Sequence, residues 1–134
     1  MPIDISKFTK SFVEPHCLPD NSEAKVRIET AEETIAKTSG NPMIAVRLSI
    51  PADPAANDIF HNQMLPGDGF DAKQNNNIIK RLGDFCTAFG IPNPVKTPKF
   101  SVEDWIGKEG YWILKLEETD RGPRNSLKQP TKRA

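Results

Sequence analysis

Residues 71–90, with the sequence DAKQNNNIIKRLGDFCTAFG, decide how the rest of the chain is arranged. Counted from Ile78, the apolar residues fall at positions i, i+1, i+4, i+7, i+8 and i+11, which is one stripe on a helix. Asp71 can cap the first turn with Gln74 three residues later, and Gly90 stands where helices commonly end. The pattern therefore predicts an amphipathic helix over residues 71–89 that docks on a sheet.

Three segments before this helix have the pattern of strands. Residues 24–31 and 43–50 alternate between apolar and polar side chains, as half-buried strands do. The apolar face carries Ala24, Val26, Ile28, Ile44, Val46, Leu48 and Ile50. Residues 58–65 form a third strand of weaker pattern, and the alternation leaves open which face carries Phe60. The segment 38–42, TSGNP, is a turn signal between the first two strands.

Two more strands follow the helix. Residues 111–117 place Trp112, Leu114 and Leu116 on one face, and residues 124–129 can pair back across the turn at 120–123. Three strands, a helix and two strands predict a mainly β fold. We expect an OB-fold-like, five-stranded Greek-key β-barrel with the helix between strands 3 and 4. An open α+β sheet or a sandwich with the same element order is the alternative.

The flanks of this domain differ from it in composition. We expect residues 1–22 to form an N-terminal arm, residues 23–129 the OB-like domain, and residues 130–134 a basic, disordered C-terminus. Phe8 and Phe12 are four residues apart, so they share one face of a short helical turn. We expect them to anchor the arm to the core.

The composition excludes several classes of protein. The 134 residues balance 18 basic against 18 acidic side chains, so a nucleic-acid-binding surface would need segregated charge. The first residues lack the apolar segment of a signal peptide, and no apolar run is long enough to cross a membrane. We therefore expect a cytoplasmic protein in which Cys17 and Cys86 are thiols.

The chain lacks the residue patterns of catalysis. His16 and His61 are isolated, and we expect both on the surface or in loops. Cys86 belongs to the apolar stripe of the helix, where a buried, inert thiol is the usual state. No zinc-ligand spacing, phosphate-binding glycine loop or nucleophile motif is present. We expect a non-enzymatic binding module without metal or cofactor.

The strand faces opposite the apolar ones carry cations and a ring, which suit single-stranded nucleic acid. Cations hold phosphates, and an aromatic ring stacks on a base. The residues concerned are Lys25, Arg27, Arg47, Tyr111, Lys115, Arg121, Arg124 and Lys128. A charged outer face is also what every half-exposed sheet has, so the pattern alone does not identify the ligand.

Five segments in order resemble a phage and prophage family of small proteins, long regarded as a domain of unknown function. They are residues 24–33, 37–44, 79–91, 105–108 and 121–128. Members of that family look like OB-fold single-stranded DNA-binding proteins and are encoded near phage recombination and replication genes. The resemblance, which spans about residues 24–130, implies sequence-nonspecific binding of single-stranded DNA during phage DNA replication or recombination.

The resemblance also implies particular binding residues. It favours Lys25, Arg27, Lys37, Arg121, Arg124, Asn125 and Lys128. Phe60, Tyr111 and Trp112 are candidate stacking rings from strand geometry alone. Phage replication or recombination proteins and further copies of the chain are candidate partners. The chain departs from many single-stranded DNA-binding proteins in ending basic rather than acidic, which argues against recruitment of partners through an acidic tail.

Three other functions compete with DNA binding. A protein-binding adaptor or inhibitor could use the barrel groove or a strand edge, and its binding would be insensitive to salt. A virion structural component would form large homo-oligomers. An enzyme would need a deep pocket with titratable groups of shifted pKa.

Overall fold

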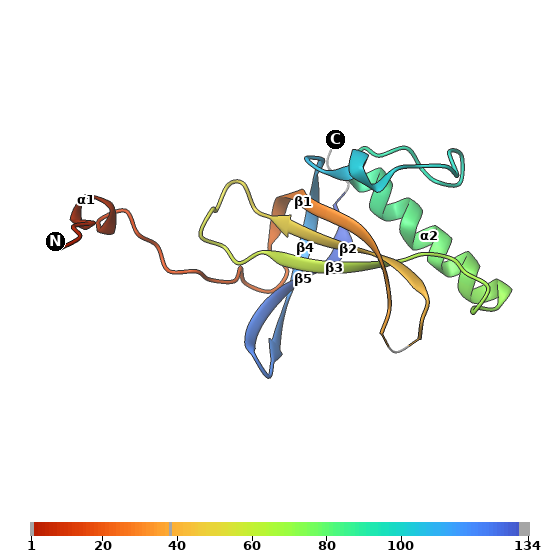
Figure 1. Ribbon diagram of the computed structural model, residues 1–134, viewed down its shortest axis with the longest axis horizontal. Helices are drawn as coiled ribbons and strands as arrows, with labels where there is room; N and C mark the ends of the chain where they lie inside the picture. The colour runs from red at the N-terminus through yellow and green to blue at the C-terminus, as the bar shows by residue number, and fades with distance from the viewer. Residues whose placement is uncertain (1, 38, 132–134) are drawn as a thin grey trace.

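The computed structural model describes residues 2–37 and 39–131, and it contains one antiparallel sheet with a helix packed against it (Figure 1). The strands are β1 (Glu23–Ile35), β2 (Pro42–Ser49), β3 (Ile59–Met64), β4 (Glu109–Thr119) and β5 (Gly122–Pro130). The helices are α1 (Ser6–Thr9), α2 (Ala72–Ala88) and the 3₁₀ turn η1 (Val102–Trp105). The mainly β fold with the helix between strands 3 and 4 is therefore confirmed.

The five strands form one antiparallel sheet in the order β3-β2-β1-β4-β5. Strand β1 pairs with β4 over residues 23–27 and with β2 over residues 27–35, and the β1–β2 ladder has a register shift between Ile28 and Thr30. The outermost strands, β3 and β5, come into contact, but within residues 2–37 and 39–131 no ladder joins them. The sheet is thus barrel-like and remains open between β3 and β5.

Helix α2 begins and ends where the sequence predicts. The Asp71 side chain accepts from the Gln74 amide, the Gln74 side chain accepts from the Asp71 amide, and Gly90 follows with a φ of +70°. A Cβ at Gly110 would collide with the carbonyl oxygen of Ala88. Glycine at that position therefore allows β4 to approach the end of α2.

The core lies between the sheet and α2. Alternate residues of β1 and β2, among them Val26, Ile28, Ile44 and Leu48, are fully buried. The ring of Phe85 from α2 contacts the rings of Trp105 and Trp112. These are the faces that the alternation and the helical stripe predict.

Strand β1 is longer than its apolar pattern predicts. Residues 32–35 continue to pair with β2, although three of the four are polar and all four side chains are exposed. The β2 residues opposite them pair with β3 from Met43 on, and Ile44 among them is fully buried. The end of the β1–β2 hairpin projects from the body (Figure 1). Because β1 is exposed on both faces there, the alternation of a half-buried strand does not reveal it.

The N-terminal segment is fixed to the body at residues 16–22 and not at its phenylalanines. Phe8 and Phe12 are 62% and 67% exposed, so the expectation that they anchor the arm is wrong. The contacts begin at His16, whose amide donates to Ala55 O and whose carbonyl accepts from the Asn57 amide. Backbone hydrogen bonds of Asn21 and Ser22 with Leu114 then lead into the sheet.

The far C-terminus is described only up to Thr131. Pro130 is the last residue of β5, and the Thr131 amide donates to Tyr111 O, so both belong to the sheet rather than to a tail. The rest of the predicted disordered terminus, Lys132 to Ala134, and Thr38 of the predicted turn lie outside the described residues. Of the helices described, none is long and apolar enough to cross a membrane.

Candidate nucleic-acid interface

The outer face of β2 and β3 carries the exposed aromatic side chain of Phe60. The ladder pairs Arg47 with Phe60, Ala45 with Asn62 and Met43 with Met64. We call these six residues the β2–β3 face. The neighbouring positions Ile44, Val46, Leu48 and Ile59 point into the core, so the alternation fixes Phe60 on the outer side. Phe60 is 73% exposed, and the fold gives this ring no packing role.

Arg47 lies directly across the ladder from Phe60 and is held by an acidic neighbour. Its Nη1 atom is 2.8 Å from Oδ2 of Asp58, and both side chains are partly exposed. On its other side Arg47 pairs with Thr30 of β1. The ion pair orients the guanidinium beside the ring, while its exposed position leaves the remaining donors accessible to solvent.

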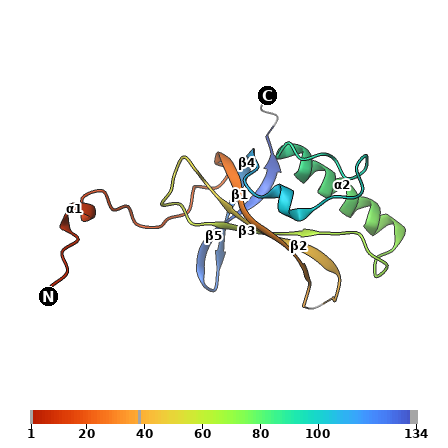
Figure 2. The same ribbon diagram turned by 45° about the horizontal axis from the view of Figure 1, so that its top comes forward.

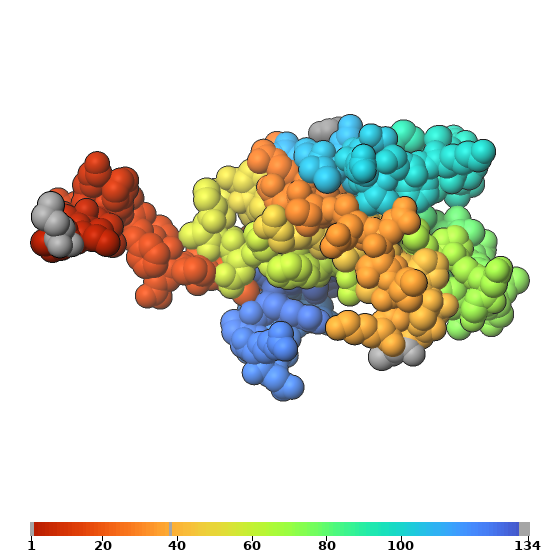
Figure 3. Space-filling model, in the orientation of Figure 1, coloured from red at the N-terminus to blue at the C-terminus, as the bar shows by residue number. Residues whose placement is uncertain are grey.

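Two hairpins project on the same side of the molecule, one beyond each end of β3 (Figures 1 and 2). Lys37 lies at the tip of the β1–β2 hairpin and Arg121 at the tip of the β4–β5 hairpin, and both are exposed. Among the described residues no carboxylate forms an ion pair with either side chain. The space-filling view shows a hollow between the two hairpins (Figure 3). The hollow thus has a cation on each side that is available for phosphate.

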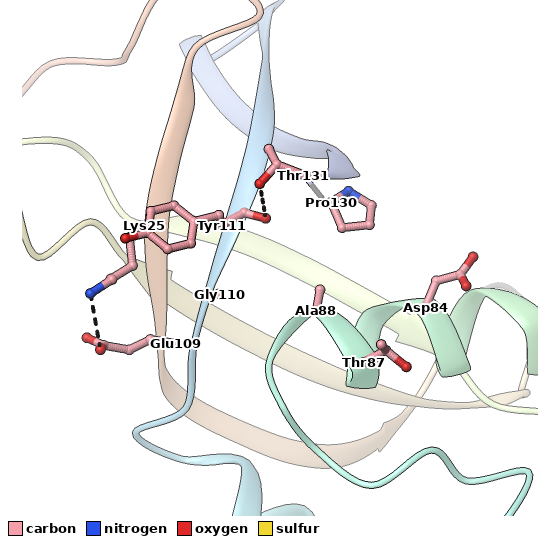
Figure 4. A pocket seen from close by; sticks show the side chains of 9 residues that line it. All are labelled: Lys25, Asp84, Thr87, Ala88, Glu109, Gly110, Tyr111, Pro130 and Thr131. Carbon is pink, nitrogen blue, oxygen red and sulfur yellow. Dashed lines mark hydrogen bonds and ion pairs between the residues drawn. The ribbon is translucent and has the colours of Figure 1, made fainter. Parts of the chain in front are cut away.

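The predicted cations of β1 lie beside Tyr111 and share one carboxylate. Arg27 Nη2 is 2.7 Å and Lys25 Nζ is 3.9 Å from the carboxylate of Glu109. Lys25 Nζ also lies 5.7 Å from the centre of the Tyr111 ring. A pocket of about 610 Å³ separates this group from the end of α2 (Figure 4). Because Asp84 and Glu109 line it as well as Lys25, the pocket is not uniformly cationic.

Two predicted cations of the β4–β5 hairpin, Lys115 and Arg124, also have a carboxylate partner, whereas Lys128 contacts a neutral amide. Glu117 accepts from Lys115 Nζ at 3.2 Å and from Arg124 Nε at 3.1 Å. The hydrogen bonds from these two cations lower the pKa of Glu117. Lys128 Nζ donates to Asn21 Oδ1 at 2.7 Å. The outward orientation of the basic residues is therefore as predicted, but acids that the sequence analysis did not single out neutralise much of their charge.

Two predicted site residues lie in the interior. Trp112 is 6% exposed and contacts Phe85 and Phe89, so it cannot stack on a base in the folded protein. Asn125 is 4% exposed. Its side chain accepts from the Leu18 amide at 2.8 Å and donates to the carbonyls of Leu18 and Lys115. Asn125 thus fixes the N-terminal segment to β5, and it does not face a ligand.

His61 is not the surface residue that the sequence predicts. It lies on the inner face of β3, stacked on the Phe85 ring with 5.2 Å between centroids, and its Nε2 bonds Gln63 Oε1. Burial lowers the pKa of His61. The placement of Phe60, which the sequence left open, decides that of His61, because neighbours on a strand face opposite ways.

The fold and the β2–β3 face together define a small, mainly β protein with a barrel-like antiparallel sheet and an exposed aromatic residue on β3. A family model described as a protein of unknown function (DUF669) matches residues 7–125. The chain therefore belongs to the DUF669 family. None of the curated proteins compared with the chain matches it.

Proposed function

We propose that the protein binds single-stranded DNA on the β2–β3 face, without sequence preference and without catalysing a reaction. OB-folds bind oligonucleotides on the face of strands 2 and 3 and between the loops that join strands 1–2 and 4–5. In this chain that region carries Phe60, Arg47 and the two hairpin tips. The observation that carries the proposal is the 73% exposure of Phe60 beside Arg47.

Each group has a separate role in this proposal. The Phe60 ring stacks on a base, while Arg47, Lys37 and Arg121 contact phosphates. All bases present a π face, so stacking gives affinity without sequence preference. The resemblance described above suggests that the bound strands are those displaced in phage DNA replication or recombination, in the cytosol of the host.

The paired cations set the expected salt dependence. Lys25, Arg27, Lys115 and Arg124 have carboxylate partners, so phosphate would have to compete for them. Lys37 and Arg121 then neutralise about two phosphates, and Arg47 adds a third where phosphate competes with its partner Asp58. With a slope of about −0.7 per neutralised phosphate, log K should fall against log salt with a slope of about −1.4 to −2.1.

The test is fluorescence anisotropy of labelled oligo-dT across a salt series, with a duplex of equal length for comparison. Phe60→Ala should weaken binding about 5- to 150-fold, since one base stack contributes about 1–3 kcal/mol. The variant should change the free energy of unfolding by less than about 0.5 kcal/mol, because the ring is exposed. Val95→Ala is the matched control, since Val95 is 65% exposed on the segment after α2.

The charged residues are tested in the same way. Lys37→Ala and Arg121→Ala should each reduce the salt slope by about 0.7, whereas Lys80→Ala on the exposed side of α2 should not change it. Equal affinity of the duplex, or an unchanged affinity in Phe60→Ala, would contradict the proposed face. A folded protein that binds no single strand at low salt would instead favour a protein-binding adaptor.

A further inference from the structure

The arm of residues 2–15 carries large apolar side chains that the body does not cover. Ile3, Ile5, Phe8, Phe12 and Val13 are each at least 58% exposed. In both views the arm extends away from the sheet and α2 (Figures 1 and 2). Soluble proteins rarely expose such a concentration of apolar side chains unless it contacts a partner.

The root of the arm is fixed to the body, so the arm projects from a defined point on the surface. His16 forms a parallel bridge with Ala56, and its Nε2 is 2.7 Å from Asp53 Oδ2. Leu18 is bonded to Asn125 through both its amide and its carbonyl. Beyond this root, fourteen residues can span up to about 45 Å when extended. That length reaches well into a neighbouring molecule.

The body has a groove with both apolar and polar side chains in its lining, at the place where the sheet is open. The β3–β5 groove, of about 500 Å³, is lined by residues 61–64 of β3, residues 127–130 of β5, Trp112 and four residues of α2. Its volume is within the range of pockets that hold drug-sized ligands, so two phenyl side chains fit. Both strands that border it are edge strands of the sheet, which can accept an extended segment.

One polar atom of this groove lacks a partner. Trp112 is 6% exposed, and its Nε1 has no acceptor within the described part of the chain. The Nε1 atom of Trp105, outside the groove, is in the same state, so this feature does not by itself identify a ligand. The groove is lined by apolar side chains such as Leu127 and by polar ones such as Gln63 and Asp84, which suits a peptide better than a purely apolar ligand.

We propose that the arm of one molecule docks in the β3–β5 groove of a second copy. The chain supplies both halves of this contact, and its arm extends away from β3, β5 and α2, whose residues line the groove (Figure 1). Phe8 and Phe12 each offer roughly 100–150 Å² of surface for burial. The formal net charge of zero means that two copies repel each other little. Reciprocal exchange of two arms gives a closed dimer with twofold symmetry.

Photo-crosslinking of the full-length protein tests the contact. A benzophenone amino acid replaces Phe8 in one population, which is mixed with an isotope-labelled population of the unmodified chain. Crosslinks should join position 8 to residues 61–64 or 127–130 of the other population. Crosslinks only within one copy, or to other surfaces, would overturn the proposal.

The oligomeric state provides the second readout. Sedimentation analysis should show a concentration-dependent dimer, and Phe8→Ser with Phe12→Ser should raise its dissociation constant at least tenfold. Val95→Ser, an exposed apolar residue outside the arm, should leave the dimer unchanged. A monomer at all concentrations, or a dimer unaffected by the double substitution, would refute arm exchange. Neither result depends on DNA, so the outcome is separate from that of the Phe60 test.

Discussion

Asn125 should be a residue of stability and not of DNA binding. Its side chain is 4% exposed and makes three hydrogen bonds, of 2.8, 2.9 and 3.2 Å, to Leu18 and Lys115. A buried hydrogen bond contributes about 1 kcal/mol net, so Asn125→Ala should lower the free energy of unfolding by about 3 kcal/mol. For a chain of this length, at about 4 °C per kcal/mol, the melting temperature should fall by about 12 °C.

Urea denaturation measures this loss, and hydrogen exchange locates it. The Leu18 amide should lose protection in Asn125→Ala, because its acceptor has been removed. Asn125→Asp keeps an acceptor for that amide but has no donor for the two carbonyls, so it should also be destabilised. Ser126→Ala is the matched control at the next, half-buried position.

The DNA assay completes the prediction for Asn125. At a temperature where the variant is folded, oligo-dT affinity should be within about twofold of that of the native protein. A loss of stability below about 1 kcal/mol, together with a loss of DNA affinity, would refute the structural role. It would restore the ligand-contacting role that the family resemblance implies.

Two further predictions concern titratable groups. Burial raises the pKa of Cys86 to about 11. A thiol reagent at pH 8 should therefore modify only the partly exposed Cys17 in the folded protein, and both cysteines in urea. Rapid reaction of Cys86 in the folded protein would contradict this. Hydrogen bonds to the Glu14 carbonyl, the larger cause, and to the Asp53 carboxylate raise the pKa of His16 above 6.5. The contribution of protonated His16 to the stability of the fold is therefore complete below pH 6.5 and is lost as the pH rises through the raised pKa. An NMR titration should show the raised pKa, and Asp53→Asn should bring it back toward 6.5; an equal pKa in both would refute the contribution of Asp53.

The elements of this fold were predictable because their signals are local. The capping pair Asp71 and Gln74, Gly90, and the alternation of the first two strands each lie within one segment of sequence. The order of these elements then leaves few ways to form a sheet. The open seam was not predictable, because the distance between β3 and β5 depends on the packing of α2 against both.

The candidate site was less predictable, because its interactions join distant residues. Arg27 is neutralised by Glu109, which is 82 positions away, and Leu18 lies 107 positions from Asn125. A sequence shows that such side chains face outward or inward, but it does not show which of them meet. Trp112 illustrates the difference: its even position in β4 places it with Leu114 on the apolar face, and the structure confirms this face over a stacking role.

The loop between β2 and β3 links the two proposed surfaces. Asp53 and the amide of Asn57 hold His16 at the root of the arm, while Asp58 holds Arg47 beside Phe60. In a pair that exchanges arms, two β2–β3 faces would be held within one complex. Two sites on one strand then act at a high effective concentration, so the affinity can exceed that of either site by 10²- to 10⁴-fold, on the order expected for linked sites. Arm exchange would thus allow a protein of zero net charge, with few unpaired cations per face, to hold single-stranded DNA tightly.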